Sequence, residues 1–180
     1  MKEKKLILVS NDDGINARGL KYLIEMTKPF GDLLVVAPST GQSGMSHSIS
    51  STVPLRIKEI SKTPGITMYS VSGTPVDCVK LAINDLLERT PDLMVSGINH
   101  GSNAAINVIY SGTMGAAIEA SLHGIPAIGF SVDDHSLNAD FSVVLKYGPK
   151  LIDMVLKNGL PERVSLNVNF PVVDEKNFKG

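Results

Sequence analysis

The residues best suited to chemistry in this chain are two adjacent carboxylates, Asp12 and Asp13, which follow a short apolar run. Two other polar segments also follow apolar runs, one containing Ser43 and one ending at Asn99. Carboxylate, hydroxyl and amide oxygens are hard ligands, and without sulfur they suit Mg²⁺, Mn²⁺ or Ca²⁺ better than zinc. Two aspartate charges would balance one divalent ion, so the residues indicate a candidate cation site.

An ordinary turn is the alternative explanation for the sequence Asp12-Asp13-Gly14. Aspartate and glycine are also the residues that turns and helix N-caps select, so this segment alone leaves both interpretations open. The positions of the other polar segments favour the cation site.

Those positions follow from the elements that the sequence predicts. Residues 5–10, with the apolar run Leu6 to Val9, and the apolar residues 33–37 are typical of strands buried on both faces of a parallel sheet. Apolar residues at helical spacing lie between them, from Leu20 to Thr27, so the chain begins with a βαβ unit. Residues 92–99 and 126–132 predict further buried strands. Because ligands bind beyond the carboxyl ends of parallel strands, the polar residues after each strand are expected to converge, Ser131 included.

The remaining elements continue the α/β alternation. Residues 53–60, 67–72 and 164–170 predict strands, and Thr74-Pro75 with Asp77 predicts a helix start, which gives Asp77 and Cys78 structural roles. A helix is also expected over residues 139–157, kinked or divided at Gly148-Pro149. Residues 39–51 are small and polar and predict a long loop, which we interpret as functional.

A third feature is Ser111-Gly112-Thr113, which opens a predicted helix ending before Gly124. Two hydroxyls and free backbone N–H groups at a helix N-terminus can receive a phosphate. An ordinary serine or threonine cap explains the same residues, so the motif alone does not decide. Neither of the glycine-rich phosphate-loop patterns GxxxxGK[ST] and GxGxxG is present.

The histidines divide into two groups. His47 and His100 lie in the segments that follow candidate ligands, so a supporting role in the site stays open for each. His123 is expected to cap a helix C-terminus and His135 to lie in a polar loop, with no part in the site. The sequence around Ser43 lacks the GxSxG pattern, which disfavours a serine hydrolase.

Composition limits the classes of partner. The chain has 180 residues, 43% of them hydrophobic, enough for one domain with its own core. A net charge of −1 with no basic run gives no reason to expect a nucleic-acid polymer or a membrane surface as partner. The longest apolar runs are far below the ~20 residues of a membrane span, and residues 6–9 are too few for a signal-peptide core. With a single cysteine, these features lead us to expect a cytoplasmic protein with a small-molecule partner.

Five motifs in this order resemble the SurE family, the survival-protein-E phosphatases. They are residues 10–14, residues 37–38 with 42–44, residues 73–79, residues 95–99 and residues 109–113. The resemblance implies a Rossmann-like α/β fold of three layers, a mostly parallel sheet with helices on both faces. It also implies a metal-dependent nucleotidase for nucleoside 5′- and 3′-monophosphates, some members also cutting short polyphosphate, with one divalent cation per subunit, Mg²⁺ or Mn²⁺.

The resemblance also assigns roles to residues. Carried over by position, the metal ligands are Asp12, Asp13, Ser43 and Asn99, and the first two are the catalytic residues. Substrate-binding positions around the phosphate are Asn103, Ser111, Gly112 and Thr113.

Two departures from the family pattern bear on substrate and assembly. Ala105 and Ile106 replace a glycine and a polar residue, which affects the expected substrate preference rather than the chemistry. Family members continue beyond residues 177–180 into an arm that exchanges between subunits. We therefore expect residues 1–180 to form a single SurE-like phosphatase domain that lacks this arm, assembled as a homodimer or homotetramer.

The expected reaction is phosphomonoester hydrolysis by metal-activated water, with Asp13 as either ligand or base. One alternative is a haloacid-dehalogenase-like phosphatase in which Asp12 attacks phosphorus. Such enzymes usually have Asp-x-Asp, whereas here the carboxylates are adjacent and Gly14 occupies the second acid's place. Another alternative is a nucleotide-binding module without catalysis, which would not need both carboxylates.

Overall fold

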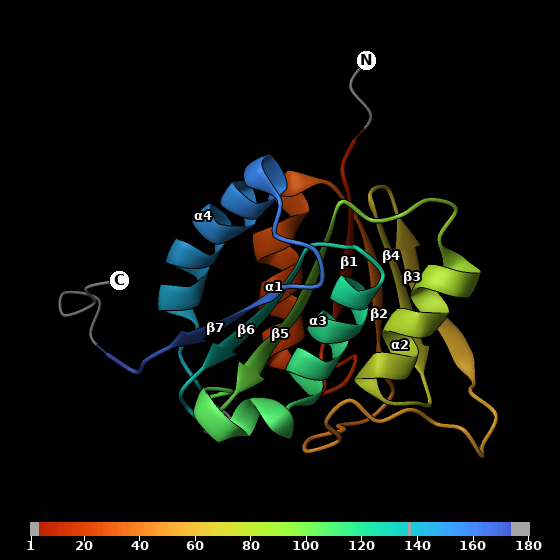
Figure 1. Cartoon of the computed structure of the whole chain (residues 1–180), viewed down its shortest axis with the longest axis horizontal. Helices are drawn as coiled ribbons and strands as arrows, with labels where there is room; N and C mark the ends of the chain where they lie inside the picture. The colour runs from red at the N-terminus through yellow and green to blue at the C-terminus, as the bar shows by residue number, and fades with distance from the viewer. Residues whose placement is uncertain (1–3, 137, 174–180) are drawn as a thin grey trace.

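A seven-stranded sheet forms the centre of the molecule in a computed structural model that describes residues 4–136 and 138–173 (Figure 1). The strand order is β3-β4-β2-β1-β5-β6-β7, and all neighbours are parallel except β3 and β4. The strands are β1 (Leu6–Ser10), β2 (Asp32–Pro38), β3 (Ile57–Thr63), β4 (Ile66–Val71), β5 (Leu93–His100), β6 (Ala127–Val132) and β7 (Ser165–Phe170). The predicted mostly parallel α/β sheet is confirmed.

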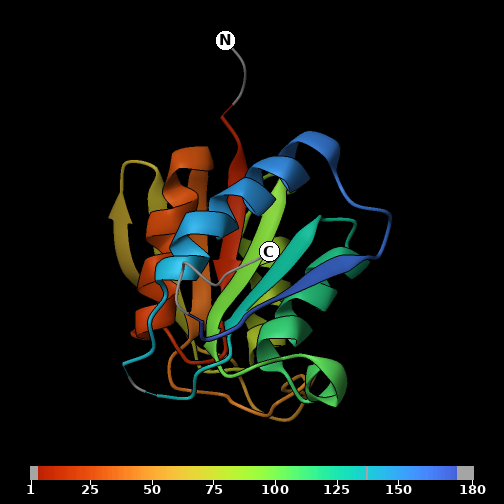
Figure 2. The same cartoon turned by 90° about the vertical axis from the view of Figure 1, so that its left-hand side faces the viewer.

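Helices cover both faces of the sheet, which makes three layers as predicted (Figure 2). Helices α1 and α4 pack on one face, and α2 and α3 pack on the other. The α-helices are α1 (Arg18–Thr27), α2 (Pro75–Leu81), α3 (Gly112–Leu122) and α4 (Ser142–Asn158); short helical turns are η1 (Lys28–Phe30), η2 (Ala82–Leu86) and η3 (Ala105–Ile109). None of the helices in the described part of the chain combines the length and apolar character needed to cross a bilayer.

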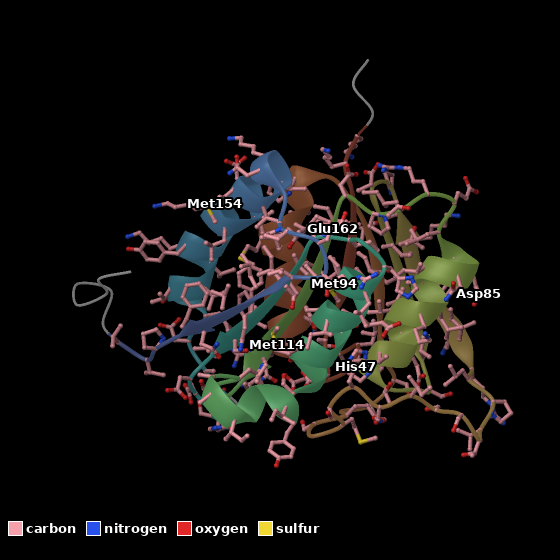
Figure 3. The ribbon with its side chains drawn as sticks, viewed as in Figure 1. His47, Asp85, Met94, Met114, Met154 and Glu162 are labelled. Carbon is pink, nitrogen blue, oxygen red and sulfur yellow. The ribbon has the colours of Figure 1, made fainter. Side chains whose placement is uncertain are left out.

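The continuous apolar runs have a direct structural cause. Successive side chains of a strand point to opposite faces, so Ile7 and Val9 join the core under α1 and α4, whereas Leu8 joins the core under α2 and α3. Met94 of β5 and Met114 of α3 lie in this second core, between sheet and helix (Figure 3). This is why residues 6–9 of the central strand β1, which has helices on both sides, are all apolar.

Helix α2 begins as the sequence predicts. The Thr74 hydroxyl accepts a hydrogen bond from the Asp77 backbone N–H, and the Asp77 carboxylate accepts one from the Thr74 N–H. Pro75 occupies the first turn, and Cys78 is fully buried. The structural roles expected for Asp77 and Cys78 are confirmed.

Two predicted elements differ from the structure. The strand expected over residues 53–60 begins only at Ile57. Ile57 pairs with Val71, the last residue of β4, so the residues before Ile57 have no strand residue of β4 to pair with. The resulting strand, β3, is a mostly exposed edge strand. A kink or a division was expected at Gly148-Pro149, and the helix is not divided there, because α4 is one helix from Ser142 to Asn158. Val144 before the proline and Ile152 after it are fully buried, so packing holds the helix across the missing hydrogen bond.

Residues 177–180, on which the expectation of a missing arm depends, lie outside the described residues.

Candidate active site

A cavity of about 360 Å³ lies beyond the carboxyl ends of the parallel strands. Figure 1 shows these strand ends at the lower edge of the sheet. Its wall includes Asp12 after β1, Ser43 in the loop after β2, Asn99 at the end of β5, and Asn103 and Ser111 in the segment before α3. Of the residues expected to converge from the strand ends, Asp12, Ser43 and Asn99 line this cavity, whereas Ser131 is not among the described residues that line it. A cleft of this size is in the usual range for small-molecule sites.

Asp12 is held from several sides and is only 4% exposed. Its Oδ1 accepts a hydrogen bond of 2.5 Å from the Thr113 hydroxyl, and its backbone oxygen accepts one of 2.7 Å from the Gln42 N–H. Gly112 leaves room for it, since a Cβ there would lie 2.8 Å from the Asp12 Cβ. Burial raises the pKa of Asp12 to about 6 against the effect of the Thr113 hydrogen bond, and the charge of Asp13 adds to the rise.

Asp13 faces a neighbouring cavity of about 310 Å³ rather than the first one. That cavity is also lined by Arg18, His100 and His135, and the two histidines line both cavities. Burial raises the pKa of Asp13, and His100 opposes the rise. Its Oδ2 is buried and has no hydrogen-bond partner within residues 4–136 and 138–173.

An unpartnered buried carboxylate oxygen is a costly arrangement that a cation would relieve. Asn99 can contribute its side-chain oxygen to such a cation. Its side-chain nitrogen points elsewhere, because it donates a hydrogen bond of 2.9 Å to the Gly101 carbonyl. The four residues carried over as ligands, Asp12, Asp13, Ser43 and Asn99, supply oxygen donors only. The residues present therefore fit a hard divalent cation.

Asn103 is fixed by the last two strands. Its side-chain amide donates to the Ser131 hydroxyl at 2.8 Å, and its backbone N–H donates to Oδ1 of Asn169 at 2.7 Å. Its backbone oxygen accepts from the Asn167 amide at 2.8 Å. Sequence reasoning identified Ser131 but missed the two asparagines of β7. Their spacing of two residues, which places both on one face of a strand, is the signal that could have found them.

Of the three residues at the start of α3 that were expected to bind phosphate, only Ser111 lines the cavity. Ser111 is the N-cap, with its hydroxyl accepting from the Met114 N–H at 3.0 Å, and it lines the cavity. Gly112 and Thr113 are not among the described residues that line it. Thr113 is fully buried and donates to Asp12, so these two residues support a carboxylate in the structure.

One histidine, His135, was expected to have no part in the site but lines the cavity. Its ring is so close to Gly101 that a Cβ there would lie 2.2 Å from it. His100 also lines the cavity, and its Nδ1 lies 2.9 Å from the Ser136 carbonyl oxygen. His47 and His123 instead contact Glu119. Asn107 of η3 and Tyr110 also line the cavity. The sequence placed Tyr110 in the motif of residues 109–113 but gave neither residue a role in the site.

Comparison with known proteins identifies the family of the chain. The family model "Survival protein SurE" matches residues 7–180. The "5'-nucleotidase SurE" of Flavobacterium johnsoniae is 57% identical over 179 residues, covering 99% of this chain and 69% of the relative. That of Christiangramia forsetii is 55% identical over 181 residues, covering 99% and 70%.

A solved structure extends the comparison to the fold. The SurE protein from Aquifex aeolicus superposes with a TM-score of 0.87 at 38% identity, covering 97% of this chain and 69% of the other. Sequence and fold agree, and the chain belongs to the SurE family of survival proteins.

Proposed function

We propose that this chain is a 5′-nucleotidase, which hydrolyses nucleoside 5′-monophosphates to nucleoside and phosphate. The observation that carries the proposal is the cavity at the strand ends, where Asp12, Ser43, Asn99 and the N-cap Ser111 share one wall. The names of the relatives support the same reaction. Nucleoside 3′-monophosphates and short polyphosphate present the same terminal phosphate and belong to the proposal as further substrates.

The proposal includes one divalent cation, Mg²⁺ or Mn²⁺, held by Asp12, Asp13, Ser43 and Asn99. Support comes from the all-oxygen donor set and from the buried Oδ2 of Asp13, which lacks a partner in the described part of the chain. When bound, the cation supplies Lewis acidity toward a phosphate oxygen and activation of water.

The chain's own residues bind and orient the substrate. The Ser111 hydroxyl can donate to a phosphate oxygen while it accepts from Met114, and it lies at the positive end of an eleven-residue helix. Thr113 fixes the orientation of the Asp12 carboxylate. The ring of Tyr110, 61% exposed at the cavity wall, offers a surface on which a nucleobase can stack.

The competing covalent mechanism uses Asp12 as nucleophile. The hydrogen bond from Thr113 and the burial around Asp12 support a fixed ligand instead. With water attacking phosphorus directly, hydrolysis of a chiral phosphate ester should invert configuration. Retention, or a trapped aspartyl phosphate at Asp12, would establish the covalent route.

Turnover of p-nitrophenyl phosphate and of a nucleoside 5′-monophosphate tests the function. We expect hydrolysis of both by the purified chain in Mn²⁺ and a loss of at least about a hundredfold in EDTA, restored by added Mn²⁺. Asp12→Asn and Asp13→Asn should lose most of the activity while keeping the fold. Near wild-type rates for Asp12→Asn would refute the cation site, and binding of nucleotide without any turnover would favour the non-catalytic module.

A further inference from the structure

The loop over residues 39–51, here called the Ser43 loop, is fastened on both sides of Ser43. Before it, the Gln42 N–H donates to the backbone oxygen of Asp12 at 2.7 Å. After it, the Ser46 N–H donates to the Tyr110 carbonyl at 3.1 Å, and the Ser46 hydroxyl donates to the Ile109 carbonyl at 2.6 Å. The position of Ser43 therefore depends on how firmly these two attachments hold.

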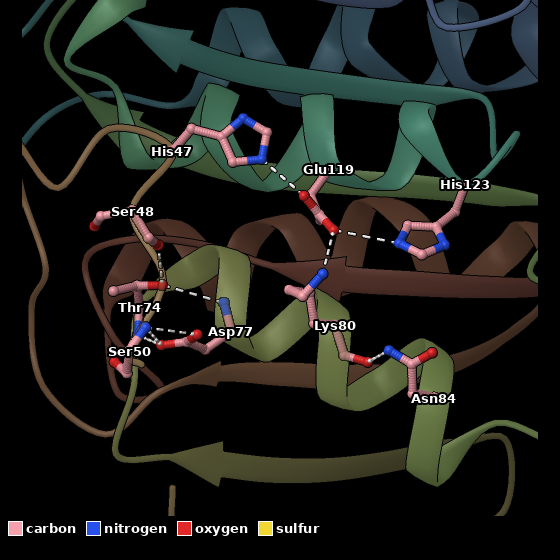
Figure 4. A network of polar contacts seen from close by, with 9 residues as sticks. All are labelled: His47, Ser48, Ser50, Thr74, Asp77, Lys80, Asn84, Glu119 and His123. Carbon is pink, nitrogen blue, oxygen red and sulfur yellow. Dashed lines mark hydrogen bonds and ion pairs between the residues drawn. The ribbon is translucent and has the colours of Figure 1, made fainter. Parts of the chain in front are cut away.

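The loop is also joined to α3 next to Ser46, through the side chain of His47. Nε2 of His47 lies 2.7 Å from Oε2 of Glu119, which projects from the middle of α3 (Figure 4). Oε1 of the same carboxylate lies 3.2 Å from Nζ of Lys80 on α2 and 3.2 Å from Nε2 of His123. One carboxylate thus joins the Ser43 loop, α2 and α3.

The environment keeps Glu119 charged. Its side chain is only 9% exposed, and burial alone would raise its pKa. Hydrogen bonds from His47, Lys80 and His123, with the charge of Lys80, outweigh burial and hold the pKa of Glu119 below its usual value. A buried carboxylate makes stronger hydrogen bonds than an exposed one, so the link to His47 is worth more than a surface contact.

Helix α3 also supports part of the cavity wall. Its first turn holds Asp12 through Thr113, and Ser111 lines the cavity. The loop backbone lies directly on this helix, since a Cβ at Gly115 would come within 2.4 Å of the Ser46 carbonyl oxygen. The way the loop sits on α3 therefore contributes, together with the Gln42–Asp12 hydrogen bond, to the relative position of Ser43 and Asp12.

We propose that Glu119, acting through His47, is a positioning residue that fixes the Ser43 loop on α3 and so sets Ser43 against Asp12. The inference rests on the proposed function, in which both residues hold the cation. Glu119 touches neither substrate nor cation in this role.

His123 provides a matched control. Its ring has the same side-chain exposure as His47, 35%, and contacts the same carboxylate. It follows α3 directly, four residues after Glu119, so its contact ties no second segment to the helix. His47→Ala and His123→Ala each remove one imidazole from Glu119, but only the first removes the link to the loop.

Two measurements on the full chain test the proposal. Hydrogen exchange by mass spectrometry reports on amides of residues 39–48, and calorimetric titration with Mn²⁺ alone reports on the cation site. For His47→Ala we expect faster exchange in the loop and about tenfold weaker Mn²⁺ binding, the loss expected for one hydrogen bond to a charged group. His123→Ala should stay within about twofold of wild type in both. His47→Gln, whose amide can still donate, should recover most of the difference.

The outcomes separate the positioning role from the proposed function. Unchanged loop exchange in His47→Ala would overturn the link itself, and faster exchange with unchanged Mn²⁺ affinity would overturn its role in the site. Equal effects of His47→Ala and His123→Ala would reduce Glu119 to a general stabiliser and overturn the proposal. A wild-type chain that binds no Mn²⁺ would refute the cation of the proposed function, whatever the exchange data show for the link.

Discussion

Asp12 is a carboxylate that the folded chain keeps almost free of solvent. Burial raises its pKa from 3.8 to about 6, so the folded state holds a proton there in a pH range where the unfolded state has lost it. The stability that this proton contributes is present below pH 3.8 and is lost as the pH rises to about 6. A shift of this size corresponds to roughly 3 kcal/mol in the cation-free protein.

Urea unfolding in EDTA measures this effect. Between pH 5 and pH 7.5, we expect wild type to lose about 1.4 kcal/mol more stability than Asp12→Asn, which has no charge to bury. The comparison between the two proteins removes the contribution of other titrating groups. Parallel pH dependences in the two proteins would mean that Asp12 ionises normally in the folded chain.

Ser111 combines two roles that one substitution can separate. As an N-cap it is worth ~1 kcal/mol of stability, and as a donor to the phosphate it would lower the barrier by roughly 3 kcal/mol. We expect Ser111→Ala to reduce kcat/KM for a nucleoside monophosphate about a hundredfold, with a small fall in the urea midpoint. A lower midpoint with unchanged kcat/KM would leave Ser111 with helix capping alone.

Tyr110 should affect the choice of substrate rather than the chemistry. Stacking of a base on an aromatic ring is worth about 1–3 kcal/mol. Tyr110→Ala is therefore expected to raise KM for a nucleoside 5′-monophosphate roughly tenfold and to leave ribose 5-phosphate, which has no base, nearly unaffected. Equal losses on both substrates would contradict a stacking role.

At the scale of elements, α1 and β5 approach each other closely at Gly19. A Cβ at Gly19 would lie 2.0 Å from the Ile98 carbonyl oxygen, one residue before Asn99. Alanine favours helices, yet Gly19→Ala should destabilise the protein by about 1–3 kcal/mol, because helix or strand must move. Lys21→Ala, on the exposed side of the same helix, serves as the control in urea unfolding. A stabilised Gly19→Ala variant would show that α1 can shift freely.

The elements show what the sequence can predict. Strands buried on both faces and the Thr74 capping box were predictable because each depends on neighbouring residues. The same holds for the positions of Asp12, Ser43 and Asn99, since parallel strands bring their carboxyl ends to one edge.

The features of the fold and the site that the sequence did not predict depend on contacts between segments that are distant in the chain. Helix α4 continues across Pro149 because of packing against the sheet, and Asn103 is held by Asn169, 66 residues later. His135 reaches the cavity from a loop whose local sequence has no periodicity. Local patterns carry no information on such partners.

At the scale of the whole molecule, the cation should stabilise the fold. A ligand that binds only the folded state adds about 2.7 kcal/mol at a hundred times its Kd. For a chain of this length we expect Tm to rise by roughly 5–10 °C in Mn²⁺ at that concentration. The Asp12→Asn/Asp13→Asn double variant should show no rise in the same thermal scan. A similar rise in both proteins would place the bound cation elsewhere.

The central place of β1 has a consequence for synthesis of the protein. Leu8 pairs on one side with Leu34 but on the other with Met94, so the first strand waits for a partner made 86 residues later. At about 5–20 residues per second on a ribosome, that wait lasts on the order of ten seconds. The hydrogen bond that holds Asn103 forms later still, because its partner Asn169 is made 66 residues after it. The nascent chain therefore exposes one edge of an apolar strand until β5 emerges, and the site that begins at residue 12 becomes complete only when β7 emerges.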